Sequence, residues 1–102
     1  MKQRILGLLG LVNHGKILVI GDSVYYSLGL KKVHLVIVAS DAGPNSAKKA
    51  RDKTTFYNCP LISFATKDEL GHAIGRNNVA VIGVTDVKIA NRILTLMKDG
   101  DI

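Results

Sequence analysis

Hydrophobic residues along this chain switch between helical and strand-like spacing from one end to the other. Ile5, Leu8, Leu9 and Val12 recur at the three- and four-residue intervals of a helix that packs on a core. Short unbroken apolar runs separate the helical segments and are typical of strands buried on both faces. The pattern predicts helices at 3–12, 22–29, 45–57, 67–74 and 87–97, and strands at 16–20, 35–39, 61–65 and 79–84.

Polar and small residues mark where these elements begin and end. Asp22 or Ser23 can cap the second helix by accepting a backbone N–H. Thr66-Lys67-Asp68-Glu69 is a capping box, and Thr85 and Asp86 are predicted to cap the last helix. The glycines of the first helix, Gly7 and Gly10, indicate close packing on a neighbour.

The alternation of helices and strands indicates one fold class. The strand, helix and strand at 16–39 imply a right-handed parallel crossover. We therefore predict an α/β fold, a three-layer α/β/α sandwich with a central four-stranded mixed sheet. The 102 residues have room for a single domain, 1–102.

Cysteine content and the N-terminus bear on the compartment. Cys59 is the only cysteine, which excludes an internal disulfide and the paired-cysteine zinc patterns. The apolar run after Lys2 and Arg4 is followed by no cleavage site of the signal-peptide type, and it is too short to span a membrane. We expect a cytoplasmic protein with no membrane partner.

Positive charge is concentrated in the first half of the chain. Residues 1–53 hold nine Lys and Arg against three Asp, so this half carries the whole net charge of +6, while the rest is neutral. A basic half attracts polyanions, although a solvated face that keeps the protein in solution has the same composition. The charge alone leaves both interpretations open.

The turn Gly21-Asp22-Ser23 has an enzymatic interpretation. It follows a predicted strand and resembles the first block of the Gly-Asp-Ser-Leu lipases and esterases. A serine needs a histidine to take its proton and an acid to orient that histidine. That family has an Asp-x-x-His near its C-terminus, and here no such spacing occurs and no histidine follows Gly75. A small serine esterase therefore stays only as an alternative, and we predict no catalytic residue.

Other signals of chemistry are absent from the sequence. There is no glycine-rich phosphate loop of standard spacing and no helical His-Glu-x-x-His, so we expect no cofactor, no metal site and no small-molecule substrate. The aromatic residues are few and placed for packing, so we assign them to the core rather than to a base-stacking platform. They are Tyr25, Tyr26, Phe56, Tyr57 and Phe64.

The order of several motifs resembles the ribosomal-protein superfamily of kink-turn RNA binders. The motifs are Ala39-Ser40-Asp41-Ala42-Gly43-Pro44 after the second strand and Glu69-Leu70-Gly71-His72-Ala73-Ile74-Gly75 in the fourth helix. Leu8-Leu9-Gly10-Leu11, Asn45-Ser46-Ala47-Lys48-Lys49 and Val84-Thr85-Asp86 resemble the small bacterial YlxQ-type members. The resemblance covers nearly the whole chain and implies a non-catalytic protein that binds a sharply bent RNA, in connection with the ribosome or translation.

The resemblance also implies where RNA would lie. The family's best RNA binders read Gly-x-Asn-Glu-x-x-Lys after the first strand. Here Gly21 matches, while the Asn, Glu and Lys positions are Ser23, Val24 and Ser27. The second RNA-facing segment of the family, the loop after the fourth helix, is Arg76-Asn77-Asn78 here. RNA binding as a class is carried over, and a preference for kink-turns is left open.

Elementary electrostatics gives partial support to this site. A helix N-terminus presents free N–H groups and a positive dipole end to phosphate oxygens, but Asp22 would cap the same donors and repel an anion. Nearby lysines would offset that charge. The predicted RNA-binding residues are Lys16, Gly21, Asp22, Ser23, Ser27, Lys31, Lys32, Arg76, Asn77 and Asn78. A protein-interaction module on the same fold is the other alternative.

Overall fold

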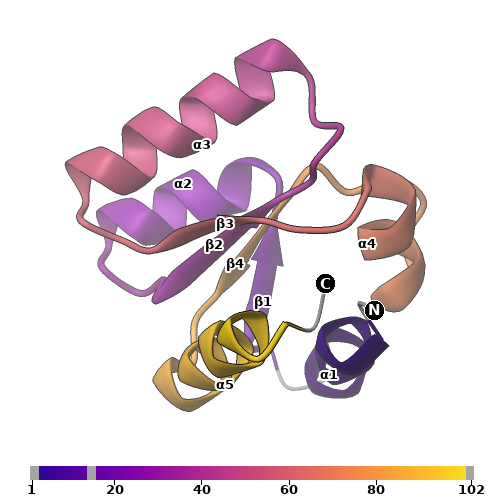
Figure 1. Ribbon diagram of the computed structural model, residues 1–102. Coiled ribbons are helices and arrows are strands. Elements are labelled where there is room, and N and C mark those ends of the chain that lie inside the picture. Colours follow the sequence, from indigo (N-terminus) through magenta and orange to yellow (C-terminus); the bar gives the residue numbers. More distant parts are fainter. Residues whose placement is uncertain (1–2, 14–15, 101–102) are drawn as a thin grey trace.

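The helices and strands follow the predicted order along the chain (Figure 1). The computed structural model describes residues 3–13 and 16–100, so His14 and Gly15, between the first predicted helix and the first predicted strand, lie outside the described residues. The elements are α1 (Gln3–Val12), β1 (Leu18–Ile20), α2 (Asp22–Gly29), β2 (Leu35–Val38), α3 (Pro44–Phe56), β3 (Leu61–Ser63), α4 (Lys67–Ala73), β4 (Val81–Val84) and α5 (Val87–Lys98).

The four strands form one mixed sheet in the order β1-β4-β2-β3. β4 is antiparallel to both β1 and β2, whereas β2 and β3 are parallel. β1 and β2 therefore run in the same direction, as the crossover prediction requires, but β4 lies between them. β1 is an edge strand, and its three residues are only half-buried. β1 packs on both faces, with Leu18 and Ile20 against one core and Val19 against the other, but the predicted burial is only partial because the strand lies at the edge of the described sheet.

Helices cover both faces of the sheet, so the three-layer arrangement is confirmed (Figure 1). Side chains of α1, α4 and α5 share the larger core with Leu35 and Ile37 of β2. α2 contributes Val24 and Leu28 to a smaller core around Val36 on the other face. The alternation along β2 explains how one continuous apolar run serves both cores.

Side-chain caps fix two of the helices as the sequence predicts. The Thr66 hydroxyl accepts from the Glu69 N–H (3.1 Å) while the Glu69 carboxylate accepts from the Thr66 N–H (2.9 Å), which completes the capping box of α4. Asp86 accepts from the Ile89 N–H at the start of α5 (3.0 Å). Both contacts satisfy donors that a helix leaves free in its first turn. The prediction of a second cap at Thr85 is wrong, because its hydroxyl donates to the Ile17 carbonyl oxygen instead (2.8 Å).

The two glycines of α1 differ in their surroundings. A Cβ atom on Gly10 would lie 2.7 Å from the Ala73 carbonyl oxygen, so α1 and α4 approach closely there. A Cβ atom on Gly7 would meet nothing within 4 Å, and the prediction of close packing is wrong at that position. Among the described residues, α3 is the longest helix at 13 residues, and none is both long and apolar enough to cross a membrane.

Candidate nucleic-acid interface

Two of the predicted RNA-facing segments lie at the same end of the sheet. β1 ends where β4 begins, since Ile20 pairs with Ile82. The Gly21 N–H donates to the Val81 carbonyl oxygen (3.4 Å), which fixes the start of α2 beside the segment that enters β4. That segment is the end of the loop containing Arg76, Asn77 and Asn78. We call this end of the sheet, where β1, β2 and β3 finish and β4 begins, the Gly21 end.

Gly21 determines how α2 starts. Its φ of 62° and ψ of −142° lie in a region that only glycine enters readily. Gly21 occupies the N-cap position, so Asp22 and Ser23 become the first residues inside the helix, and no side chain caps it. The prediction that Asp22 or Ser23 caps α2 is therefore wrong. Both side chains are exposed, and the Asp22 carboxylate does not cover the first N–H groups of the helix.

A lysine that the sequence analysis did not select lies beside Asp22. Lys49 of α3 places its ammonium 3.6 Å from the Asp22 carboxylate and 4.7 Å from the centre of the Tyr25 ring. Burial raises the pKa of the Tyr25 phenol, and the negative charge of Asp22 adds to the rise. Such an exposed ion pair contributes little to stability, but Lys49 offsets the charge that would repel a phosphate. Only the packing of α3 beside α2 brings these residues together.

The loop between α4 and β4 is held against its own helix. The Arg76 N–H donates to the Gly71 carbonyl oxygen (2.7 Å), and the Val79 N–H donates to that of Lys67 (3.1 Å). A Cβ atom on Gly71 would overlap the Asn77 carbonyl, so only glycine at 71 allows the loop to fold back this closely. Arg76, Asn77 and Asn78 are all exposed. Gly71, within the motif of the fourth helix, was the feature of the sequence that could have indicated this close approach.

Neighbouring loops brace the Gly21 end. The Ala39 N–H donates to the Ala80 carbonyl oxygen (2.8 Å), and the Ser40 hydroxyl donates to that of Ala65 (2.9 Å). The Asp41 carboxylate accepts from the Lys67 N–H (2.8 Å) at the start of α4. Ala39, Ser40 and Asp41 together therefore join the loops after β2, after β3 and before β4, which gives the motif Ala39-Ser40-Asp41-Ala42-Gly43-Pro44 a structural role.

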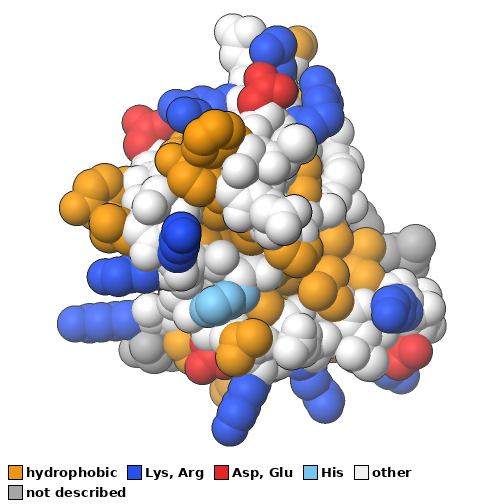
Figure 2. Space-filling view, turned by 90° about the vertical axis from the view of Figure 1, so that its left-hand side faces the viewer, with side chains coloured by type: hydrophobic (Ala, Val, Ile, Leu, Met, Phe, Trp, Pro, Cys, Tyr) orange, Lys and Arg blue, Asp and Glu red, His pale blue; other side chains and the backbone are white. Residues whose placement is uncertain are grey.

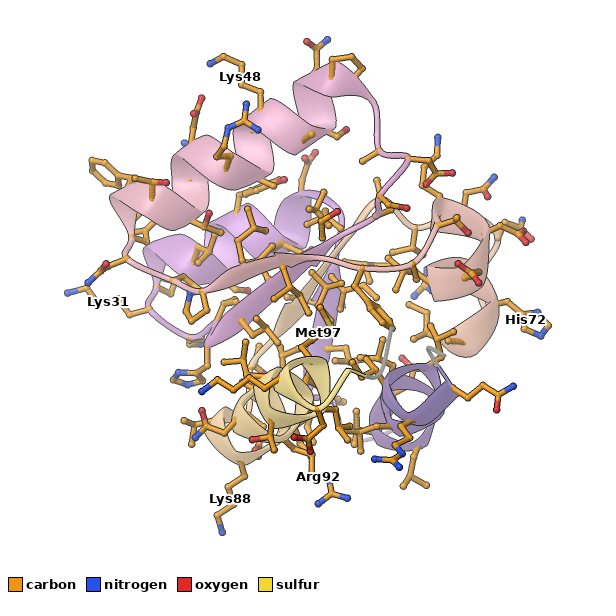
Figure 3. The ribbon with its side chains drawn as sticks, in the orientation of Figure 1. Lys31, Lys48, His72, Lys88, Arg92 and Met97 are labelled. Atoms are coloured by element: carbon orange, nitrogen blue, oxygen red, sulfur yellow. The ribbon has the colours of Figure 1, made fainter. Side chains whose placement is uncertain are left out.

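The predicted lysines do not lie at the Gly21 end. Lys16 precedes β1, and Lys31 and Lys32 precede β2, at the opposite end of the sheet. We call that end the His34 end, because the His34 N–H donates to the carbonyl oxygen of Val84, the last residue of β4 (2.8 Å). Figure 3 shows Lys31 on the side of the molecule away from α4. The eight residues of α2 separate Lys31 from Gly21, a rise of about 12 Å.

The remaining predicted residues lie along α2, and neither of the two histidines in the described part of the chain is hydrogen-bonded to its serines. Ser23 is exposed and Ser27 is half-buried. His34 lies at the far end of the sheet, and His72 points away from the molecule on α4 (Figure 3). The described residues contain no group of three His, Cys, Asp or Glu that could hold a metal ion. The arrangement gives the esterase alternative no support.

Comparison with known sequences gives consistent matches over most of the chain. The model of the ribosomal protein L7Ae/L30e/S12e/Gadd45 family matches residues 3–93. The chain is 35% identical over 91 residues to the RNA-binding protein YlxQ of Bacillus subtilis (strain 168), which covers 88% of this chain and 91% of that protein. It is 28% identical over 98 residues to the RNA-binding protein YlxQ of Enterococcus faecium, covering 95% and 94% of the two chains.

Solved structures share the fold. A protein of unknown function from Bacillus halodurans C superposes with a TM-score of 0.89 at 34% identity, covering 93% of this chain and 97% of the other. The 15.5kD RNA binding protein of Giardia lamblia superposes with a TM-score of 0.79 over 95% of this chain and 87% of the other. Because the two sequences are only 17% identical, this comparison shows a shared fold and nothing more.

Proposed function

Because the chain belongs to the ribosomal protein L7Ae/L30e/S12e/Gadd45 family, and within it to the YlxQ-type members, we propose that it is a non-catalytic RNA-binding protein. Two relatives at 35% and 28% identity are named as RNA-binding proteins. The observation that carries the proposal for this chain is the contact between the Gly21 N–H and the Val81 carbonyl. It holds the start of α2 and the loop with Arg76 at one end of the sheet.

The two segments offer different groups to an RNA. The start of α2 has no side-chain cap, so its first N–H groups and its dipole can face a phosphate. Arg76 adds a charged fork for a phosphate, and the amides of Asn77 and Asn78 can pair with base edges. An RNA with a sharp bend brings phosphates and unpaired bases close together, and unpaired bases are what proteins read in RNA.

We therefore propose a structured, kink-turn-like RNA as the ligand, in connection with the ribosome or translation, which would place the protein in the cytoplasm. Ser23 and Ser27 supply hydroxyls where the family's best RNA binders carry an amide and a cation. Arg76 and Lys49 are cations at this end, and Asp22 opposes them. If two phosphates are neutralised, the logarithm of affinity falls with the logarithm of salt concentration with a slope of about −1.4 to −1.8.

A binding assay with matched charge reversals tests the proposal. A labelled RNA hairpin with an unpaired bend is titrated with the protein, and a continuous duplex of equal length is the control ligand. Arg76→Glu should weaken binding to the bent RNA about 10-fold or more, because a charge-assisted hydrogen bond is lost. Arg92→Glu, on the exposed side of α5, carries the same charge change and should have little effect (Figure 3). Absence of binding to both RNAs, or equal losses in the two variants, would contradict the proposal.

A further inference from the structure

Most aromatic side chains of this protein are not in its core. Phe64 is buried, but Phe56 is 77% exposed, Tyr26 is 72% exposed and Tyr57 is 36% exposed. The prediction that all of them belong to the core is wrong. α3 packs on the sheet through the small residues Ala50 and Thr54, which leaves its last aromatic residue outside.

Phe56 and Tyr57 lie where α2 and α3 end, and Tyr26 lies in the last turn of α2. A Cβ atom on Gly29, the last residue of α2, would lie 3.5 Å from the Tyr57 hydroxyl, so the Tyr57 ring lies over the end of that helix. Phe56 and Tyr57 meet edge to face, with ring centres 4.9 Å apart. Tyr26 and Leu30, which is 48% exposed, are one turn apart on α2. Exposed apolar rings of this size are uncommon on a protein surface without a partner.

Lysines accompany the rings on this side of the molecule. Lys31 and Lys32 follow α2, and Lys53 lies one turn before Phe56 and Tyr57; all three lysines are exposed. Figure 2 shows hydrophobic side chains interleaved with Lys and Arg on this side. We call the surface formed by Tyr26, Leu30, Lys31, Lys32, Lys53, Phe56 and Tyr57 the aromatic-lysine surface.

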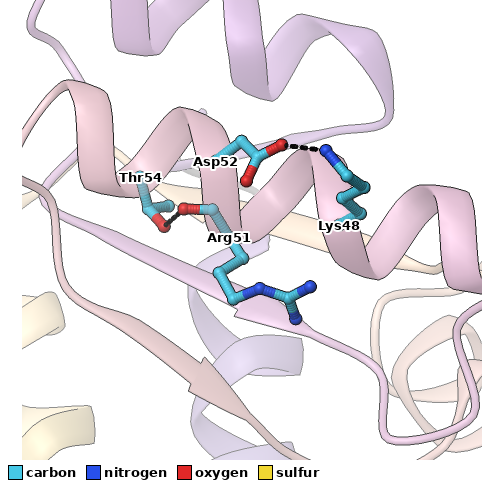
Figure 4. A network of polar contacts seen from close by, with 4 residues as sticks. All are labelled: Lys48, Arg51, Asp52 and Thr54. Carbon is cyan, nitrogen blue, oxygen red and sulfur yellow. Dashed lines mark hydrogen bonds and ion pairs between the residues drawn. The ribbon is translucent and has the colours of Figure 1, made fainter.

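Asp52, the acidic residue next to Lys53 in α3, is already paired with another lysine. Asp52 accepts a hydrogen bond from the Lys48 ammonium (2.7 Å), one turn away on the same helix (Figure 4). That hydrogen bond holds the pKa of Asp52 below its ordinary value, so the carboxylate stays ionised and engaged with Lys48. Lys53 is therefore available to an external anion.

A depression lies between Tyr57 and the segment that precedes β2. Its volume is about 240 Å³, and its lining includes Tyr57, Asn58, Lys31 and His34 over the apolar side chains of Leu28 and Val33. A planar base fits a depression of this size, and the amide and imidazole offer hydrogen bonds to its edge. Cys59 also lines it.

The geometry points to a second RNA-contact surface: the aromatic-lysine surface takes an unpaired, single-stranded RNA segment. Bases would stack on Phe56, Tyr26 and Tyr57, and phosphates would pair with Lys31, Lys32 and Lys53. Aromatic rings within a basic surface are the combination that single-stranded nucleic acids require. The inference rests on the proposed function for the class of ligand, but it concerns the His34 end of the sheet, away from Gly21 and Arg76.

A matched pair of substitutions tests the stacking. The probe is a fluorescein-labelled decamer of uridine, titrated at low salt with the full chain. Phe56→Ser should weaken binding between about 5- and 150-fold, which corresponds to the loss of one stacked base. Leu11→Ser is the control, because Leu11 is also 77% exposed but lies on α1, across the sheet. Both substitutions remove an exposed side chain, so neither should unfold the protein.

Charge reversal tests the phosphate contacts. Lys53→Glu and Lys32→Glu should each reduce the salt slope of decauridine binding by about 0.7, whereas Lys88→Glu on α5 should leave it unchanged. Lys31 is left intact because it also lines the depression, so its replacement would change more than one phosphate contact. Bound decauridine should also slow alkylation of Cys59 by iodoacetamide, because the thiol lines the depression.

The outcomes separate this inference from the proposed function. Absence of decauridine binding, equal losses with Phe56→Ser and Leu11→Ser, or loss with Arg76→Glu alone would each overturn the second surface. None of these results would contradict the proposal that the bent RNA binds at the Gly21 end. A protein that binds to the aromatic-lysine surface while decauridine does not would also overturn it.

Discussion

Replacing Gly21 with alanine tests how the start of α2 is built. Gly21 has φ 62° and ψ −142°, and a Cβ atom there would meet nothing within 4 Å. The substitution therefore adds no clash, and its whole cost is the backbone conformation. The strain would lie in the turn that joins β1 to α2 and positions α2 beside Val81.

The size of the effect follows from that conformation. A residue with a side chain held in this region costs about 1–3 kcal/mol. Alanine also lowers the conformational entropy of the unfolded chain, which stabilises the folded state by about 0.4–1 kcal/mol at most. Each kcal/mol corresponds to a shift of roughly 4–8 °C in the melting temperature of a domain of this size. We expect a destabilised variant that still folds.

Thermal unfolding of two alanine variants, followed by circular dichroism, measures the difference. Gly7→Ala is the matched control, because a Cβ atom on Gly7 also meets nothing within 4 Å but Gly7 lies inside α1. Alanine in a helix interior is favoured over glycine by about 0.5–1 kcal/mol, so this variant should melt higher. Equal melting temperatures for the two variants would refute the conformational argument for Gly21.

Three further predictions concern other parts of the chain. Gly71→Ala should displace the loop at Asn77 and weaken binding of the bent RNA, measured by titration at a temperature where thermal unfolding shows the variant to be folded. Unchanged affinity would mean that the loop does not contact RNA. Thr66→Ala should cost about 1 kcal/mol of unfolding free energy in urea, whereas Thr95→Ala, at an exposed position of α5, should cost little. Burial raises the pKa of the Cys59 thiol, so alkylation of the folded protein should reach its half-maximal rate at a higher pH than alkylation in urea; coincident pH profiles would exclude that burial.

The local elements could be predicted because their signals are local. Apolar spacing set the helices and strands to within a few residues, and the Thr66 capping box needs only two side chains three positions apart. The mixed sheet and the three layers followed from the alternation of elements and the family resemblance. The order of the strands did not, because the position of β4 between β1 and β2 depends on contacts between distant parts of the chain.

The candidate site was predicted only in part for the same reason. Gly21 and Arg76 were identified along the sequence, and the sheet brings their segments to one end. Lys31 and Lys32 are close to Gly21 in sequence, but the length of α2 carries them to the other end. Lys49 was missed because only the packing of α3 beside α2 brings it to Asp22.

Exposure of the aromatic side chains could be read from the sequence only in part. Tyr57 follows Ala50 and Thr54 at helical spacing, and that spacing does not indicate that the core beneath the helix ends at Thr54, whereas Phe56 lies on the other side of the helix from Thr54. The extent of a core depends on the layer as a whole, which a single helix does not reveal.

The central claim is that RNA binds at the Gly21 end of the sheet. Its most direct test is to record backbone amide resonances of the labelled protein by NMR while the bent RNA is added. The amides of Gly21 to Ser23 and of Arg76 to Asn78 should shift first and most, and those of α5 should stay in place. Shifts confined to other regions, or no shift at saturating RNA, would contradict the account.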